Sequence, residues 1–349
     1  MGRLNKIILT LALTGLIISP SAVKADIPGP AEGYSNQRAE QILSDDVFVK
    51  TDESTELNAS GACGDKLNWE YDPSKHKLII SGSGEMYDYD APKSTGVNEN
   101  TAPWQSIIED KVSLTISEGV TSIGCNAFYG CDLKSVSLPD SLRKIGDYAF
   151  ADSRLTKIKL PSGLTELGDG AFMTCARLKS INLPGGLTGI GSETFSGCGL
   201  KKVKLPKNIK VIGDYAFSNC AKLAKVKFPK DSHIKIGYEA FSGCGFKKLK
   251  LPNGSVDDID SYAFASCSKL QSVKIGEGIA QINGYAVFYD CKLNKISLPV
   301  SLTSIGEGTF SQCIKLKNVF YPGTEEEWGK ISIGNDNDFL LSAKMHYGK

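Results

Sequence analysis

Cysteine carries the most reactive side chain in this sequence, and it occurs ten times. A thiol can form a disulfide, bind a metal or attack a substrate, and each role constrains its spacing. Eight of the ten lie three residues after a phenylalanine, and these phenylalanines recur every 22 to 24 residues. The eight are Cys131, Cys175, Cys198, Cys220, Cys244, Cys267, Cys291 and Cys313. A thiol that recurs at this period occupies the equivalent position in every turn of a stack of coils, so we predict a ladder of buried thiols.

Covalent pairing within this ladder is disfavoured. Ser153 occupies the same place in the second repeat, so the place requires a small, weakly polar side chain and not a bonded partner. Neighbouring turns lie about 4.8 Å apart, which permits a disulfide by distance, but parallel side chains in register are poorly oriented for one. Cys63 and Cys125 fall outside the ladder and are the candidates for a disulfide. The sequence leaves open whether these two pair.

Histidine and carboxylate groups are the other candidates for catalysis or metal binding. His76, His233 and His346 are far apart, and no pair has the spacing of metal ligands. The acidic cluster at 257–260 could hold a calcium ion weakly, although a solvated loop is the simpler interpretation. We therefore predict no catalytic residue, no metal site and no cofactor, and we do not expect an enzyme.

Lysine dominates the positions at which a binding surface would form. Alternate side chains of a short strand point outward, and the outward positions of the repeats hold lysine often and no acidic residue. The predicted basic face consists of Lys157, Lys159, Lys202, Lys204, Lys225, Lys227, Lys248, Lys250, Lys274 and Lys295. Such a stripe would attract a polyanion, with binding that weakens as salt rises. Alternatively, lysine only keeps the strand face soluble and prevents pairing at sheet edges.

The repeat that positions these side chains reads Ile-Gly-x-x-Ala-Phe-x-x-Cys, then Leu-x-x-Val-x-Leu-Pro. Its anchoring phenylalanines are Phe128, Phe150, Phe172, Phe195, Phe217, Phe241, Phe264, Phe288 and Phe310. We expect their rings to stack in the core, and we expect Gly146 to take a positive backbone angle at a corner. A period of 22 to 24 residues is typical of a solenoid. We predict an α/β repeat solenoid of about nine rungs, with short parallel strands on one face and a cap at each end.

The start of the chain predicts export. A positively charged beginning, an apolar run and the small residue Ala25 are typical of a signal peptide that is cleaved after that residue. Residues 26–110 carry a net charge of −11 and residues 111–349 a net charge of +9, so the basic character belongs to the repeats. The predicted domains are a signal peptide (1–25), a flexible polar linker (26–60), an N-terminal cap (61–110), the repeats (111–320) and a C-terminal cap (321–349).

The repeat resembles that of a known family. The segment from Leu302 to Cys313 (LTSIGEGTFSQC) is similar to the BspA-type leucine-rich repeat of bacterial surface proteins. The resemblance covers about residues 61–348, including the entry segment from Cys63 to Trp104 and the closing segment that begins at Tyr321. It implies a right-handed coil and a role in attachment to host or neighbouring-cell components. It implies no shared catalytic residue.

Together these features predict a secreted or cell-surface recognition or adhesion module, whose strand face binds a protein or glycan of another cell or matrix. We expect a monomer with no transmembrane segment once the signal peptide is removed. Nucleic acid is not an expected partner, because the strand face lacks the interleaved aromatic residues that stack on bases. The alternative is a structural, self-assembling surface protein without a specific soluble ligand.

Overall fold

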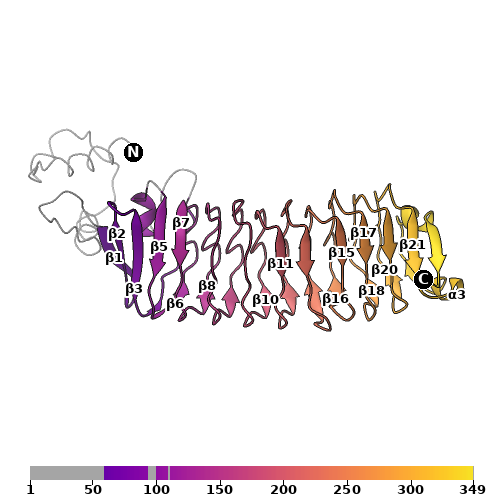
Figure 1. Cartoon of the computed structure of the whole chain (residues 1–349), viewed down its shortest axis with the longest axis horizontal. Coiled ribbons are helices and arrows are strands. Elements are labelled where there is room, and N and C mark those ends of the chain that lie inside the picture. The colour runs from indigo at the N-terminus through magenta and orange to yellow at the C-terminus, as the bar shows by residue number, and fades with distance from the viewer. Residues whose placement is uncertain (1–58, 93–99, 109–110, 349) are drawn as a thin grey trace, which may run out of the picture. The chain divides into compact units, whose positions relative to one another are not determined.

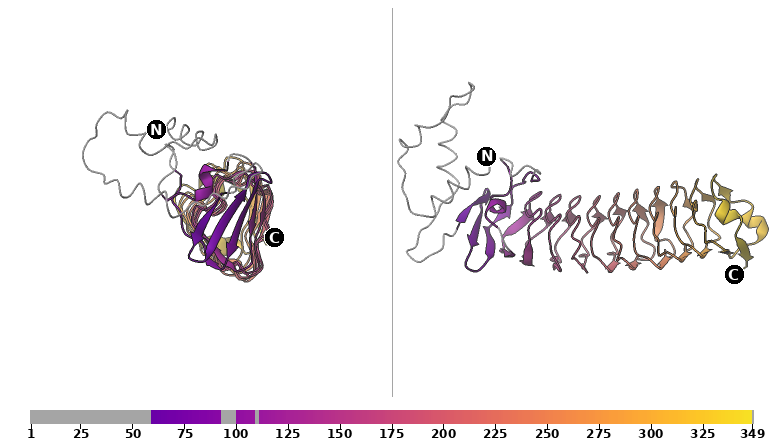
Figure 2. Two further views of the ribbon diagram at one scale, coloured as in Figure 1. Left: turned by 90° about the vertical axis from the view of Figure 1, so that its left-hand side faces the viewer. Right: turned by 90° about the horizontal axis from the view of Figure 1, so that it is seen from above.

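The computed structural model describes residues 59–92, 100–108 and 111–348, all within the unit Val47–Lys349. The predicted signal peptide and nearly all of the predicted linker lie outside these described residues. The unit is a stack of coils in which each sequence repeat forms one turn (Figure 1). Viewed along the stack, the coils lie over one another with nearly the same outline (Figure 2). The predicted repeat solenoid is therefore confirmed.

One wall of the stack is formed by the Leu-x-x-Val-x-Leu segments. Its first three strands are antiparallel, and from the third strand onward each strand pairs in parallel with the next within its sheet. The strands of this wall are β1 (Ala59–Gly64), β2 (Leu67–Asp72), β3 (Lys77–Gly82), β5 (Val112–Ile116), β7 (Leu133–Ser137), β11 (Lys202–Lys204), β13 (Lys225–Lys227), β15 (Lys248–Lys250), β17 (Ser272–Lys274), β19 (Lys295–Ser297), β21 (Asn318–Tyr321) and β23 (Lys344–Tyr347).

A second wall of strands runs along the Ile-Gly corner, whereas the sequence predicted strands on one face only. Most of these strands are two residues long, and they also pair in parallel from turn to turn. They are β4 (Gly84–Glu85), β6 (Val120–Ile123), β8 (Lys144–Ile145), β9 (Glu166–Leu167), β10 (Gly189–Ile190), β12 (Val211–Ile212), β14 (Ile234–Ile236), β16 (Val256–Ile259), β18 (Gln281–Ile282), β20 (Ser304–Ile305) and β22 (Ser332–Ile333). Helix is confined, in the described residues, to η1 (Pro103–Ser106), α3 (Glu325–Trp328) and α4 (Asp338–Leu341), close to the two ends of the stack.

The repeat phenylalanines form one continuous column of rings inside the stack. All nine are fully buried, and successive ring centroids lie 5.1 to 5.6 Å apart with nearly parallel planes. Trp104 of η1 adds a further ring at the N-terminal end, 5.3 Å from Phe128. Its indole nitrogen donates a hydrogen bond to the carbonyl of Ala127 at 2.8 Å, so the polar edge of the ring is satisfied in the core.

The ladder cysteines form a second column beside the rings. All eight are buried free thiols. Seven of them, from Cys175 to Cys313, donate a hydrogen bond from Sγ to the carbonyl of the phenylalanine one turn earlier, at 3.1 to 3.4 Å. Ser153 is buried at the same place, with its hydroxyl 3.2 Å from the sulfur of Cys175. The thiols therefore act as small hydrogen-bond donors that tie each turn to its neighbour.

The corner glycines have a different role from the predicted one. The expectation that Gly146 takes a positive backbone angle is wrong, because the left-handed residue of that corner is Tyr148, at φ 53°. A Cβ atom at Gly146 would instead lie 2.7 Å from the backbone nitrogen of Cys125 in the preceding turn. Glycine is required there because two backbones approach closely, not because the angle is unusual.

The C-terminal cap closes the core with polar and helical elements. Buried Asn337 lies next to the last ring, where its Oδ1 accepts a hydrogen bond from the backbone nitrogen of Phe310 at 3.0 Å. Its Nδ2 donates to the carbonyls of Gly306 and Gly334 at 2.9 and 2.8 Å. Helix α3 begins at a capping box in which Thr324 and Glu327 each bind the other's backbone. The bond to the backbone nitrogen of Phe310 takes the place of the bond that this nitrogen makes to the next turn in the earlier repeats.

Candidate functional site: a lysine-rich strand face

The strands β11 and β13 place four lysines in register on one wall. Lys202 pairs with Lys225 and Lys204 pairs with Lys227 in parallel. All four side chains are exposed, while the valine at the centre of each strand is buried. This alternation arises because the valines must face the core, which directs both flanking lysines to solvent.

The same pattern continues in β15, β17 and β19 with some positions changed to serine. Lys248 lies opposite Ser272, Lys250 lies opposite Lys274, and Ser272 in turn lies opposite Lys295. The four lysines are exposed. The face therefore presents lysine on consecutive turns, interrupted by short hydroxyl side chains.

Lys157 and Lys159 belong to a turn that is not a regular strand. Residues 155–160 carry no strand assignment, although both lysines are exposed and the neighbouring Ile158 and Leu160 are buried. The contact with the following turn includes only a long backbone hydrogen bond, from Lys179 nitrogen to Thr156 oxygen at 3.5 Å. Ile158 and Leu160 still pack into the core, so Lys157 and Lys159 remain exposed although the segment lacks the regular hydrogen bonds of a strand.

The positive charge of this face is not neutralised within the described part of the chain. The ion pairs formed by lysine or arginine there involve Lys75, Lys144, Arg154 and Lys330, and none of the ten face lysines. Strands in one sheet lie about 4.8 Å apart, so lysines on adjacent turns repel each other by about 1 kcal/mol in water, and less where the side chains splay. The face is thus a mild cost to folding that an anionic ligand would relieve.

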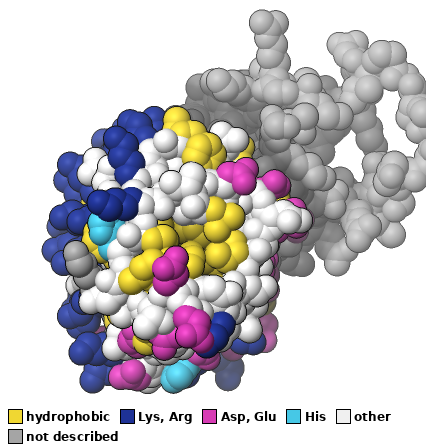
Figure 3. Space-filling model, turned by 90° about the vertical axis from the view of Figure 1, so that its right-hand side faces the viewer, with side chains coloured by type: hydrophobic (Ala, Val, Ile, Leu, Met, Phe, Trp, Pro, Cys, Tyr) yellow, Lys and Arg dark blue, Asp and Glu magenta, His cyan; other side chains and the backbone are white. Residues whose placement is uncertain are grey.

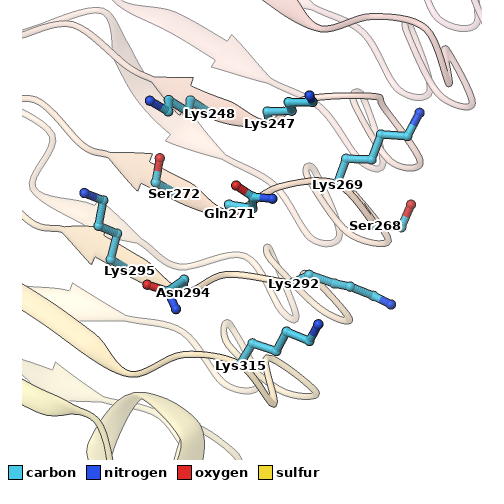
Figure 4. Close-up of a pocket in the computed structure, with 10 residues that line it drawn as sticks. All are labelled: Lys247, Lys248, Ser268, Lys269, Gln271, Ser272, Lys292, Asn294, Lys295 and Lys315. Atoms are coloured by element: carbon cyan, nitrogen blue, oxygen red, sulfur yellow. The ribbon is translucent and has the colours of Figure 1, made fainter.

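A second column of lysines, not included in the predicted face, borders the strands. Lys269, Lys292 and Lys315 lie in loops one or two residues after a ladder cysteine, and Lys247 directly precedes β15. With Lys248 and Lys295 they line a groove of about 510 Å³. The loop lysines and the strand lysines lie on either side of Gln271 and Asn294 (Figure 4). This column could have been predicted from the lysine that recurs one or two residues after the ladder cysteine.

The remaining candidate groups are scattered. Cys63 and Cys125 are free thiols, the first buried and the second half-buried. Burial raises the pKa of the Cys63 thiol to about 12 and also raises the pKa of Cys125. Nδ1 of His233 lies 2.8 Å from a carboxylate oxygen of Asp257, and His346 lies 2.9 Å from the side-chain oxygen of Asn318.

Metal-binding clusters are also absent from what the structure describes. Within 59–92, 100–108 and 111–348, no group of three or more His, Cys, Asp or Glu is placed to hold a metal ion. In the acidic cluster at 257–260, Asp257 lies beside His233, and Asp260 accepts a hydrogen bond from the backbone of Ser261 at 2.6 Å. These carboxylates are therefore used separately.

Comparison with known proteins decides the family. The profile described as "BspA type Leucine rich repeat region (6 copies)" matches residues 110–224 and 188–317, which is more than half of the chain. The chain belongs to this family. The matched residues include the buried ladders from Phe128 to Cys313 and the strands β11 to β19 that carry the lysines.

Solved structures of leucine-rich repeat proteins resemble the chain. A leucine-rich repeat protein from Bacteroides ovatus is 24% identical, with a TM-score of 0.52 over 82% of this chain and 90% of that one. A leucine rich cell surface protein from Faecalibacterium prausnitzii is 22% identical, with a TM-score of 0.34 over 80% of this chain and 99% of that one. The pneumococcal vaccine antigen PcpA is 19% identical, with a TM-score of 0.44 over 82% and 87%. A search of curated proteins finds no match.

Membership in the BspA-type family accounts for the fold, and the first of these structures has a similar fold. At such identities the likeness concerns the fold alone, and the ligand must be argued from this chain's own surface. No helix among the described residues combines the length and apolar character needed to cross a membrane.

Proposed function

We propose that this protein is an exported recognition or adhesion module that binds an anionic macromolecule of another cell or of a matrix through its lysine-rich strand face. The role is binding without catalysis or a cofactor. The observation that carries the proposal is the line of exposed lysines on β11, β13, β15, β17 and β19, which has no carboxylate at the outward positions and no ion pair within the described residues.

The architecture supports this role physically. A stack repeats one outward position at regular intervals, so weak contacts can be summed along an extended ligand. A single exposed ion pair contributes only about 0.2–1 kcal/mol, which makes several parallel contacts necessary for useful affinity. The same electrostatic origin predicts that salt weakens binding.

A direct test replaces by serine the six lysines of β11, β13 and β15, which lie on three successive turns. The substituted residues are Lys202, Lys204, Lys225, Lys227, Lys248 and Lys250. Binding of the mature chain to sulfated polysaccharide is then measured at about 50 mM and about 500 mM salt. We expect the unmodified protein to bind at low salt and the variant to bind at least about tenfold more weakly.

The outcome separates binding from solubility. Lysine that only keeps the strand face soluble could be replaced without any effect on affinity, although the variant would become more prone to aggregate. Unchanged affinity at low salt would therefore contradict the proposed function.

Export is part of the proposal and has its own test. The pattern in residues 1–25 supports cleavage after Ala25, so the secreted protein should begin at Asp26. Mass spectrometry of the intact secreted chain measures this directly. A secreted chain that retains residues 1–25 would show that this segment is not removed.

A structural, self-assembling role is the second candidate, and the C-terminal end of the stack favours it. There β23 is the last strand of its sheet, and Leu341 is 58% exposed. Seen from this end, hydrophobic side chains lie near the middle of the end face, with lysines and arginines along one side (Figure 3). Size-exclusion chromatography with light scattering distinguishes the two roles, since a monomer up to high concentration argues against assembly.

A further inference from the structure

The groove beside the strand face concentrates positive charge on two sides. Lys269, Lys292 and Lys315 form the loop side, and Lys248 and Lys295 form the strand side (Figure 4). The groove spans four consecutive turns, or roughly 14 Å along the stack. Within the described residues, none of these lysines makes an ion pair or a side-chain hydrogen bond, so their ammonium groups are available to a ligand.

The floor of the groove is polar and uncharged. Gln271 and Asn294 lie between the two lysine sides, whereas Ser272 lies on the strand side and Ser268 on the loop side (Figure 4). No acidic or aromatic residue is among the ten that line the groove. None of these four side chains bonds to another described residue, whereas the backbone of Gln271 is held by the backbone of Lys247 at 2.9 Å. Hydroxyl and amide groups that point out of a fixed backbone can both donate and accept hydrogen bonds.

A comparable hollow near the N-terminal end is less suited to an anion. It has a similar volume, about 520 Å³, and is also lined by lysine and arginine. However, Arg154 pairs with Asp132 at 3.3 Å, and Lys75 pairs with Asp72 at 2.6 Å. Part of its charge is therefore already neutralised, which leaves the groove at 247–315 as the stronger anion site.

We propose that this groove binds an anionic polysaccharide, with its sulfate or carboxylate groups on the two lysine columns and its hydroxyl groups on the Gln271 and Asn294 side chains between them. The inference rests on the proposed function and names the ligand class and its position. A polysaccharide fits because it offers both kinds of group along one chain. An acidic peptide offers carboxylates with few hydroxyls, and a nucleic acid would find no aromatic side chain on which to stack its bases.

Three variants test this proposal. The column variant is K269S/K292S/K315S, and the floor variant is Q271A/N294A. The control is K207S/K230S/K235S, which removes the same charge from exposed lysines outside the groove. Each protein is titrated with dextran sulfate, with poly-glutamate and with uncharged dextran at low salt.

We expect the column variant to bind dextran sulfate about tenfold more weakly, while the control changes less than about twofold. The floor variant should lose several-fold affinity for dextran sulfate and none for poly-glutamate. Uncharged dextran should not bind measurably to any of the proteins.

Failure of this inference can be distinguished from failure of the proposed function. Column and control variants with equal affinity would overturn the groove, even if the six-lysine strand variant still lost binding. A floor variant that weakens poly-glutamate binding as much as dextran sulfate binding would overturn the polysaccharide and favour an acidic protein. Folding of each variant is checked by circular dichroism, and all substituted residues are exposed.

Discussion

Replacing Phe217 by alanine tests the physical basis of the whole stack. Phe217 is fully buried near the middle of the ring column. Its ring lies 5.3 Å from that of Phe195 and 5.1 Å from that of Phe241. Its carbonyl also accepts the thiol hydrogen bond of Cys244 at 3.2 Å. Because that carbonyl belongs to the backbone, the substitution removes the ring and keeps the hydrogen bond.

The expected loss follows from two contributions. Deleting a buried phenylalanine ring costs about 3–5 kcal/mol through lost transfer energy and the remaining cavity. Each stacked neighbour adds about 0.5–1.5 kcal/mol beyond buried area, part of which those mutational values already include. We therefore expect Phe217→Ala to lower the free energy of unfolding by about 4 kcal/mol. Phe310 has one stacked ring neighbour, at 5.6 Å, so Phe310→Ala should cost about 1 kcal/mol less.

The assay must detect local as well as global opening, since a stack of repeats can unfold in part. Guanidinium unfolding in reducing buffer, followed by circular dichroism, gives the global value. Amide hydrogen exchange in residues 195–241 gives the local one. A loss below about 1 kcal/mol by both measurements would mean that the ring column does not hold the turns together.

Three further predictions follow from the ladders and the corners. Gly213→Ala should lower the free energy of unfolding by denaturant by about 1–3 kcal/mol, because its Cβ would lie 2.7 Å from the nitrogen of Ser192. Gly185→Ala is the control: no heavy atom lies within 4 Å of its Cβ, so stability should change by less than about 0.5 kcal/mol. A thiol reagent at about pH 8 should modify Cys125 slowly and leave the nine buried cysteines intact until denaturant is added. Mass spectrometry counts the modified thiols, and rapid modification of several buried cysteines would contradict their burial. Burial raises the pKa of Cys220 from 9.0 to about 12, so the folded state keeps a proton that the unfolded state releases. Thermal melts should therefore show stability falling from about pH 9 to about pH 12, and a Cys220→Ser variant should lose less stability over that range.

Much of the core could be predicted because its residues keep a fixed phase. The phenylalanine recurs at the same position in all nine repeats and the cysteine in eight of them, with Ser153 in the second, so this position must be filled by a similar side chain in every turn. Trp104 extends the same period beyond the nine phenylalanines. It lies 24 residues before Phe128, within the period of the repeat, and its ring heads the column.

Features that depend on contacts between turns were harder to predict. The closeness of Gly146 to the backbone of Cys125 is a property of stacking, and nothing in the single repeat separates it from a requirement for a positive angle. The thiol hydrogen bonds have the same origin, since each crosses from one turn to the next. The loop lysines were hard to predict for another reason. Lys292 directly follows its cysteine, whereas Lys269 and Lys315 come two residues after theirs, so the column is regular in space and irregular in sequence.

The interior and the exterior of each turn are physically separate, and this separation makes the binding tests interpretable. The rings and thiols make their contacts inside the stack, while the face and groove lysines make no ion pair in the described chain. Replacing these lysines by serine removes repulsion between adjacent turns and leaves the buried ladder unchanged. Such variants should therefore be at least as stable as the parent chain. Any loss of affinity that they show would then belong to the surface itself, because the scaffold beneath it would be intact.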